Sequence, residues 1–285
     1  MIPVAFDYVR AGSLADALAA LAAKDGTKVI AGSHSLLPVM KFRLAQPPRL
    51  LDIGGLAELK GIADHEGGVR IGAATTYREL LDAPLVQARV PILVECTHQI
   101  GDVQVRNRGT IGGALAHADP ASDLPAVMVV LDATMVLRSA RGERRVRARE
   151  FFEGPFTTAL AEDELLTHVL VPALPAGAGT AYVAQNAAAS GYAIAACAAL
   201  VTRSAGTVTA AAAALTGVGD MTRLIPSVAA LVGTAGDAAA IAAAAAGAVD
   251  GLDVQGDVHA PAEYRAHLAK VIAGRALQLA LSRAR

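Results

Sequence analysis

The amino-acid sequence predicts an α+β protein that ends in a small antiparallel sheet covered by helices on one face. Two segments near the start of the C-terminal third, residues 192–202 and 207–216, have the pattern of strands and lie close enough to pair. Helical patterns then fill the chain from residue 227 almost to its end. Strands followed by a run of helices favour the α+β class, with the helices on one face of the sheet.

Length and composition set the broad class of the protein. A chain of 285 residues is long enough for two or three subdomains, each with its own apolar interior. The formal net charge of -1 gives no electrostatic basis for binding nucleic acid or an anionic membrane. Apolar runs such as residues 193–201 fall short of the roughly 18 residues that a membrane helix needs. We expect a cytoplasmic protein without an integral membrane segment.

The two cysteines support a reducing compartment. Cys96 and Cys197 lie far apart in apolar surroundings, which is typical of buried free thiols. Two thiolates alone cannot hold an iron-sulfur cluster that needs four. The seven histidines show no metal-ligand spacing, so we expect no metal site.

The first candidate binding segment, the serine loop (residues 31–36), follows a predicted buried strand over residues 28–31. Ser13 is expected to cap a preceding helix with leucines at 14, 18 and 21 on one face. Gly32 permits positive φ, and the serines on either side of His34 offer hydroxyl donors beside their own N–H groups. The sequence equally allows a turn that merely closes the strand.

The second candidate segment, the glycine loop (residues 109–114), is the least core-like stretch of the chain. Gly109, Gly112 and Gly113 bracket two other residues, a spacing that lets bare amides face a ligand such as phosphate. The alternative is a glycine-rich hairpin that binds nothing. Further on, Ser122 and Asp123 are predicted to cap a helix over residues 124–131.

The remaining elements follow from periodicity and from turn residues. Strands are predicted over residues 50–53, 69–73 and 165–171, and helices over 77–81 with Thr76 as N-cap, 84–100, 227–232, 238–249 and 262–283. Residues 134–149 predict a hairpin whose arginines occupy a solvated face, which we favour over an RNA-binding role. The Pro- and Gly-rich stretch 172–179 marks the start of a C-terminal domain.

Several common catalytic motifs are absent. Gly217-Val-Gly219 lacks the third glycine of a Rossmann turn, and the chain contains neither a P-loop nor a nucleophile elbow. Ser33 and His34 are too close in sequence for triad geometry. Two donor-rich loops of different sequence therefore indicate a ligand with more than one anchoring point, such as a dinucleotide with its pyrophosphate.

Motifs in order along the whole chain resemble the FAD-binding medium subunit of molybdenum hydroxylases, and most closely the carbon monoxide dehydrogenase type. They are Met1-Ile-Pro-Val-Ala-Phe-Asp-Tyr8, the run from Ala31 to Leu44, Thr110-Ile-Gly-Gly-Ala114, His117-Ala-Asp-Pro-Ala-Ser-Asp123, Glu164-Leu-Leu-Thr and Gly191-Tyr-Ala. The resemblance implies FAD as cofactor, held by an N-terminal region of two lobes, residues 1–60 and 61–175. It also implies a C-terminal domain, residues 180–285, with a three-stranded sheet and a helical cover.

The resemblance implies a set of cofactor contacts and no catalytic residue. In this family, backbone amides of the serine loop and of residues 110–114 grip the FAD pyrophosphate. A carboxylate matching Asp123 anchors the cofactor, Leu166 packs near the isoalloxazine, and Tyr192 faces the ring. The implied binding residues are Lys28, Ala31, Gly32, Ser33, His34, Ser35, Leu36, Thr110, Ile111, Gly112, Gly113, Ala114, Asp123, Leu166 and Tyr192.

The family role is electron exit from a heterotrimer, which can itself dimerise. Electrons leave the substrate at a molybdenum centre on a large subunit and pass through two two-iron clusters on a small subunit. They reach FAD and then quinone, NAD or oxygen. Two other functions fit the same motifs: a stand-alone FAD-dependent oxidoreductase that acts directly on a small molecule, and a flavin-binding scaffold without catalysis of its own.

The chain departs from the family pattern at three places. Ser33 stands where this branch usually has a second glycine, and Ala114 replaces an asparagine or serine. Residues 184–189 carry no charge, whereas relatives have several lysines and arginines there. The third departure bears on a positive partner for reduced flavin or on the surface that docks the iron-sulfur subunit.

Overall fold

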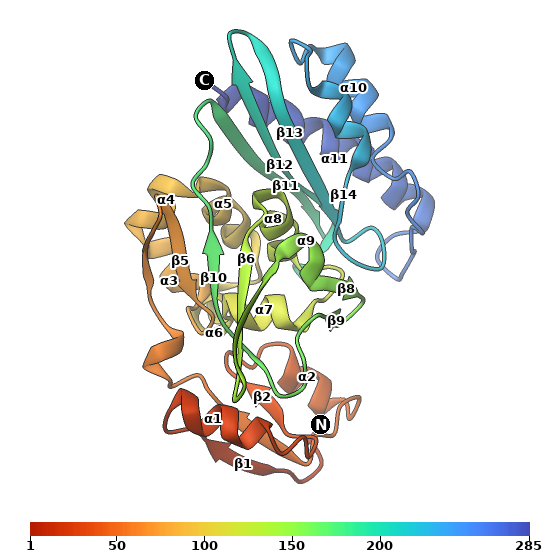
Figure 1. Ribbon diagram of the computed structural model, residues 1–285. Coiled ribbons are helices and arrows are strands. Elements are labelled where there is room, and N and C mark those ends of the chain that lie inside the picture. Colours follow the sequence, from red (N-terminus) through yellow and green to blue (C-terminus); the bar gives the residue numbers. More distant parts are fainter.

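The computed structural model describes residues 1–285 and confirms the α+β class. Three sheet-bearing parts follow one another along the molecule, with the chain termini at opposite ends (Figure 1). We refer to them as the N-terminal lobe (residues 1–60), the middle lobe (61–175) and the C-terminal part (180–285).

The N-terminal lobe is a small parallel sheet with two helices. Its elements are β1 (Asp7–Arg10), α1 (Leu14–Leu21), β2 (Lys28–Ile30), α2 (Leu36–Lys41), β3 (Arg49–Asp52) and the 3₁₀ helix η1 (Ala57–Leu59). The strand order is β1-β3-β2. Ser13 caps α1 by accepting a hydrogen bond from the Asp16 amide, and the predicted leucine face of α1 is buried.

The middle lobe carries an antiparallel five-stranded sheet in the order β4-β5-β10-β6-β7. Its strands are β4 (Ile62–His65), β5 (Gly68–Gly72), β6 (Thr134–Ser139), β7 (Gly142–Arg147) and β10 (Leu165–Val171), with a separate pair β8 (Phe152–Gly154) and β9 (Thr157–Thr158). Its helices are α3 (Tyr77–Asp82), α4 (Pro84–Arg89), α5 (Pro91–Gln99), α6 (Val103–Arg108), α7 (Ile111–His117), α8 (Asp123–Leu131) and α9 (Ala148–Phe151).

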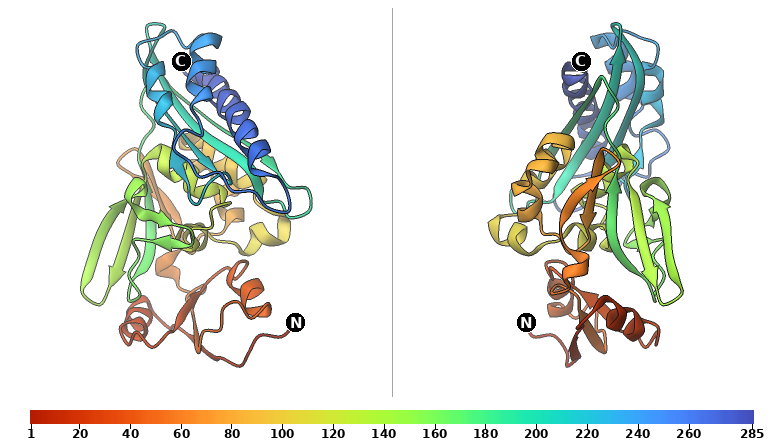
Figure 2. Two further views of the ribbon diagram at one scale, coloured as in Figure 1. Left: turned by 90° about the vertical axis from the view of Figure 1, so that its right-hand side faces the viewer. Right: turned by 60° about the vertical axis from the view of Figure 1, so that its left-hand side comes forward.

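The C-terminal part is an antiparallel sheet with helices on its outer face (Figures 1 and 2). Its elements are β11 (Ala178–Asn186), β12 (Ala193–Ser204), β13 (Thr207–Thr216), β14 (Arg223–Leu224), the 3₁₀ helix η2 (Pro226–Leu231), α10 (Ala238–Ala246) and α11 (Ala262–Arg283). Helix α11 lies very close to β11: a Cβ added to Gly179 would come within 2.1 Å of the Ala280 carbonyl oxygen. The glycine at position 179 permits that approach.

Helix α8 joins the middle lobe to the C-terminal part. Every residue of α8 is buried, because the helix packs between the middle lobe and strands β12 and β13. One cluster of buried side chains extends from Val69 in β5 to Ala214 in β13. A second cluster, in the N-terminal lobe, takes in Leu165 of β10. Since buried clusters cross both expected boundaries, the division into three domains stays a prediction.

Several predicted elements differ from the structure. The helix expected over residues 84–100 is broken at Val90 (φ -136°, ψ 59°), because Pro91 lacks an N–H and disfavours helical geometry in the residue before it. The uncharged segment 184–189 begins inside β11, a strand that is not among the predicted elements. The C-terminal sheet has four strands instead of three, since the two-residue β14 pairs with β13.

Smaller differences concern the ends of helices. Residues 226–231 form a 3₁₀ helix, and α10 ends at Ala246, before the predicted residue 249. Asp123 opens α8 as expected, but the Ser122 side chain makes no capping hydrogen bond. Thr76, by contrast, forms a complete capping box with Glu79 at the start of α3.

Candidate functional site

A cavity of about 920 Å³ lies between the N-terminal lobe and the middle lobe. It is lined by residues from the segments 21–36, 73–77, 100–123, 156–166 and 190–192. Of the predicted cofactor residues, only Ile111 is absent from the lining, because its side chain is fully buried in α7. The two candidate loops, far apart in sequence, therefore share one cavity.

The serine loop presents a run of backbone amides without protein partners. The amides of Gly32, Ser33, His34, Ser35 and Leu36 donate to no acceptor in the protein. The loop is held by its side chains instead: Ser33 Oγ donates to the Ala31 carbonyl (3.2 Å) and His34 Nδ1 lies 2.9 Å from the Gly32 carbonyl. Successive free amides of this kind form a concave anion site.

The residue in the left-handed conformation is Ser33 (φ +71°), and Gly32 does not have positive φ. Positive φ was therefore the wrong explanation for glycine at position 32. A Cβ on Gly32 would lie 2.2 Å from the Arg108 carbonyl oxygen. Glycine is needed there because the serine loop is pressed against the backbone that precedes the glycine loop.

The glycine loop opens helix α7, and all its amides except that of Thr110 are already used within the protein. The amide of Ile111 donates to the Thr75 carbonyl (3.1 Å) and that of Gly112 to the Ala73 carbonyl (2.8 Å). Gly113 N donates to Thr110 Oγ1 at 3.1 Å, and Ala114 N to the Thr110 carbonyl at 3.1 Å. The amide donors of residues 111–114 are thus engaged, whereas the Thr110 N–H has no acceptor in the protein and remains a free donor, together with the Thr110 hydroxyl hydrogen.

Packing within the protein also requires glycine at positions 109 and 112 of this loop. A Cβ on Gly112 would lie 2.7 Å from the Ala73 carbonyl oxygen, and one on Gly109 would lie 2.5 Å from the Tyr77 ring. Their small size lets α7 sit against residues 73–77, which themselves line the cavity. From the sequence, we interpreted the glycine spacing as room for a ligand to approach the backbone. In the structure, these glycines let two walls of the cavity pack against each other.

Asp123 is a buried carboxylate in the cavity wall and only 5% exposed. Burial raises its pKa to about 6, and the hydrogen bond that the Tyr182 hydroxyl donates to it acts in the opposite direction. Tyr182 comes from β11 of the C-terminal part, and its amide donates to Glu95 Oε2 at 3.2 Å. Glu95 in turn pairs with Arg283 of α11 at 2.6 Å. A chain of polar contacts therefore links α11 to the cavity.

Sequence reasoning missed Tyr182. Its signal would have been a strand over residues 178–186, where Thr180, Tyr182 and Val183 favour that conformation. Sequence reasoning also missed His117 and Phe156, whose rings lie 5.1 Å apart and which both line the cavity. Burial lowers the pKa of His117, which favours its neutral form at this wall.

Leu166 and Tyr192 both line the cavity, and their contacts with the isoalloxazine stay a prediction. Leu166 is buried in β10, whereas Tyr192 is 46% exposed and precedes β12. The turn before Tyr192 is closed by its carbonyl, which accepts a hydrogen bond from the Ala187 amide (2.8 Å). Residues 190–192 form this part of the cavity rim, and neither they nor the preceding residues 184–189 carry a charge.

The remaining chemistry of the chain is sparse. Cys96 and Cys197 are both free and buried, and burial raises the pKa of each thiol. No group of three or more His, Cys, Asp or Glu side chains is arranged to hold a metal ion. None of the helices combines the length and apolar character needed to cross a membrane.

Comparison with known families shows which family the chain belongs to. Residues 4–174 match the FAD binding domain in molybdopterin dehydrogenase, and residues 180–280 match the CO dehydrogenase flavoprotein C-terminal domain. The chain belongs to this family of FAD-binding medium subunits of molybdenum hydroxylase-type complexes. Members are subunits of FAD-dependent oxidoreductases, so FAD is the cofactor.

Individual relatives span the whole chain. The carbon monoxide dehydrogenase medium chain of Hydrogenophaga pseudoflava is 39% identical over 99% of both chains. The 6-hydroxypseudooxynicotine dehydrogenase complex subunit alpha of Paenarthrobacter nicotinovorans is 38% identical over 100% of this chain and 97% of its own.

Solved structures agree over the same length. Carbon monoxide dehydrogenase from Hydrogenophaga pseudoflava, in a form lacking the Mo-pyranopterin moiety, gives a TM-score of 0.97 at 40% identity and full coverage of both chains. Quinoline 2-oxidoreductase from Pseudomonas putida 86 gives a TM-score of 0.94 at 34% identity, covering 100% of this chain and 99% of its own.

The cavity fits FAD. The free amides of residues 32–36 match a pyrophosphate, whose oxygens are acceptors only. Leu166 and the ring of Tyr192 provide apolar surface of the kind that an isoalloxazine needs.

Proposed function

We propose that this chain is the electron-transfer subunit of a heterotrimeric molybdenum hydroxylase. In this role it takes electrons from the iron-sulfur clusters of a small subunit and delivers them to an external acceptor. The substrate would be oxidised on a large subunit that carries the molybdenum cofactor. The observation that carries the proposal is the full-length match to medium chains of such complexes, combined with a cavity whose free donors suit FAD.

Within this function the protein's own groups bind and orient. The serine-loop amides would hold the pyrophosphate, with the Thr110 hydroxyl as a further donor. Asp123, fixed by Tyr182, would accept hydrogen bonds from hydroxyl groups of the cofactor. FAD, when bound, supplies the redox chemistry, and the protein supplies its position and its electrostatic surroundings.

The uncharged rim beside Tyr192 bears on how the subunit works. Without a lysine or arginine between residues 184 and 192, the rim offers little stabilisation to a negative charge on the ring. It also keeps open the second function, a stand-alone oxidoreductase whose small substrate would occupy this side of the cavity. The comparisons favour the first function, since the relatives that match are subunits of complexes.

Anaerobic reduction of the purified, FAD-loaded subunit separates the two functions. For an electron-transfer subunit, candidate organic substrates should bleach the flavin absorbance slowly, and adding the two partner subunits should restore fast bleaching. Fast bleaching by a small organic substrate without partners would reject the proposal in favour of the stand-alone enzyme.

A further inference from the structure

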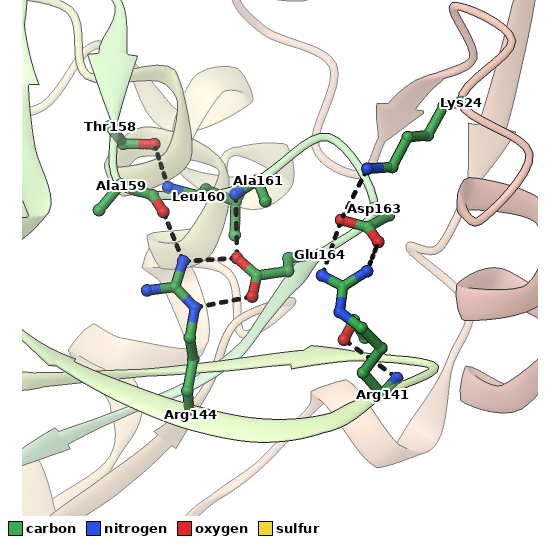
Figure 3. Close-up of polar contacts among 10 residues, drawn as sticks. Lys24, Arg141, Arg144, Thr158, Ala159, Leu160, Ala161, Asp163 and Glu164 are labelled. Atoms are coloured by element: carbon green, nitrogen blue, oxygen red, sulfur yellow. Dashed lines mark hydrogen bonds and ion pairs between the residues drawn. The ribbon is translucent and has the colours of Figure 1, made fainter.

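One side of the cofactor cavity is formed by residues 156–166, which we call the wall segment. It runs from β9 to the start of β10, and most of its residues line the cavity. Only short pieces of it belong to regular secondary structure. Backbone hydrogen bonds hold its first part, from Phe156 N to the Ala118 carbonyl (3.0 Å) and from Ala159 N to the Phe151 carbonyl (2.9 Å). Residues 160–164 are held chiefly by the side-chain contacts that Figure 3 shows.

Glu164 is the first of two buried carboxylates in the wall segment. Its side chain is 6% exposed and accepts two parallel hydrogen bonds from Arg144 of β7, at 2.7 and 2.6 Å. The same carboxylate accepts a hydrogen bond from the Ala161 amide at 2.9 Å, while Arg144 also donates to the Ala159 carbonyl at 2.5 Å. One guanidinium thus fixes a whole turn of the segment (Figure 3).

Asp163 is the second buried carboxylate, with a side chain that is 5% exposed. It pairs with Arg141, at the tip of the β6–β7 hairpin, and with Lys24 Nζ at 3.8 Å. Lys24 follows α1 in the N-terminal lobe and itself lines the cavity. Asp163 therefore connects the wall segment to both lobes that enclose the cofactor (Figure 3).

We propose that Arg144, Arg141 and Lys24 are positioning residues for FAD. They hold the wall segment against the cavity through Glu164 and Asp163, without contacting the reacting atoms. The sequence placed the hairpin arginines on a solvated face, and their side chains are indeed partly exposed, but two of them end on buried carboxylates. The proposal concerns FAD binding and does not depend on the electron-transfer role.

The energetic argument rests on burial. Exposed ion pairs contribute little, because water and salt screen them. Removing one partner of a buried carboxylate is different, since it leaves a charge that the surroundings cannot solvate. Truncating Arg144 should therefore displace the wall segment so that Glu164 reaches water, and the cavity should lose its defined shape.

The neighbour Arg145 provides a matched control. It lies next to Arg144 on β7, so its side chain points to the opposite face of the sheet. It is 61% exposed and pairs only with Glu143, at 3.6 Å. Replacing either arginine with alanine removes the same charge from the same strand, and only one of the two changes reaches the wall segment.

The test measures FAD affinity of the full chain by fluorescence quenching, together with amide hydrogen exchange. Arg144→Ala should weaken FAD binding about tenfold or more and speed exchange in residues 157–164. Arg145→Ala should leave both at the wild-type level, and Arg144→Lys should recover part of the affinity. Equal FAD affinities for Arg144→Ala and Arg145→Ala would overturn the proposal, as would faster exchange over the whole chain in Arg144→Ala.

A pH profile adds a readout that general destabilisation does not produce. The hydrogen bonds from Arg144 hold the pKa of Glu164 below its usual range. The stabilisation from this pair is therefore fully present at pH values above the usual carboxyl pKa, and it is lost as the pH falls through the lowered pKa. Asp123, whose pKa is about 6, adds the same change in FAD affinity near pH 6 to every variant. Below it, the part of the wild-type affinity that depends on Glu164 should be lost only in strong acid, and in Arg144→Ala this second loss should begin at higher pH. A second loss at the same pH in both proteins would count against the proposal.

Lys24 tests the link between the lobes. Lys24→Ala and Asp163→Asn should each weaken FAD binding, and the double variant should weaken it by less than the product of the two single effects. Fully multiplicative effects would show that Lys24 does not act through Asp163.

Discussion

Gly32 is the position where a single added atom should have the largest effect on the cofactor. Its Cβ would lie 2.2 Å from the Arg108 carbonyl oxygen, a backbone atom that cannot move aside alone. We expect Gly32→Ala to raise the Kd for FAD by about tenfold or more. Gly219→Ala is the control, because its added Cβ would meet nothing closer than 3.8 Å. Equal FAD affinity for the two variants in a titration would refute this account of the loop.

Asp123 should show a conflict between binding and stability. The rise of its pKa from 3.8 to about 6 corresponds to about 3 kcal/mol, at about 1.4 kcal/mol per pKa unit. Because the folded state holds this proton more tightly, the FAD-free protein loses that stability as pH rises from 3.8 to about 6. Asp123→Asn keeps an acceptor for Tyr182 and removes the buried charge.

The FAD-free Asp123→Asn variant should therefore be more stable than wild type at pH 7 by up to about 3 kcal/mol. The difference should vanish below pH 3.8. Urea unfolding of both proteins as a function of pH measures it. The same variant should bind FAD more weakly, and a variant that gained no stability at neutral pH would contradict the burial argument.

At the scale of elements, Thr110 has two roles that can be tested separately: it caps helix α7 and it lines the cofactor cavity. Thr110 accepts from the Gly113 amide, as Thr76 accepts from the Glu79 amide at the start of α3. Either threonine replaced by alanine should lower the free energy of unfolding by about 1 kcal/mol. Only Thr110 lines the cavity, so only Thr110→Ala should also weaken FAD binding. If both variants weakened it equally, Thr110 would be a cap and nothing more.

Elements with a strong local signal were predictable, and α1 and α11 are the clearest cases. The Ser13 cap with its leucine face and the uninterrupted pattern of residues 262–283 both correspond to observed helices. Strand β11 was missed because its strand-favouring residues, Thr180, Tyr182 and Val183, form only a short run between the Gly-rich stretch 172–179 and residues 184–186, which have no strand preference. Pairing with β12 supplies what the local sequence lacks.

The candidate site likewise has features that could be predicted from the sequence and features that depend on long-range contacts. The resemblance assigned both loops, Leu166 and Tyr192 to one cofactor site, which local patterns alone could not do. Residues of both loops and these two side chains line one cavity, and their contacts with FAD stay a prediction. The use of the glycine-loop amides was not predictable, because their acceptors lie in residues 73–75 and near Thr110 and depend on how α7 docks. The contacts of Arg144 and Tyr182 are likewise long-range, and no local pattern records them.

At the scale of the whole molecule, the shared core predicts that the middle lobe and the C-terminal part unfold together. Met128 of α8 is fully buried between them. Met128→Ala should cost about 2 to 5 kcal/mol and reduce hydrogen-exchange protection equally in α8 and in β12. Peptide-resolved exchange in low urea measures both regions at once. Unchanged protection of β12 would mean that the two parts fold as separate units.

The close packing of α11 against β11 has a consequence for directed evolution. No larger residue fits at Gly179 unless the helix moves, and α11 carries Arg283, which contacts Glu95 and the Thr180 carbonyl. Glu95 is bonded to the Tyr182 amide, and Tyr182 holds Asp123. A library selected for altered flavin affinity should therefore yield substitutions on the outer helix as well as at the cavity, and these should arise in compensating pairs.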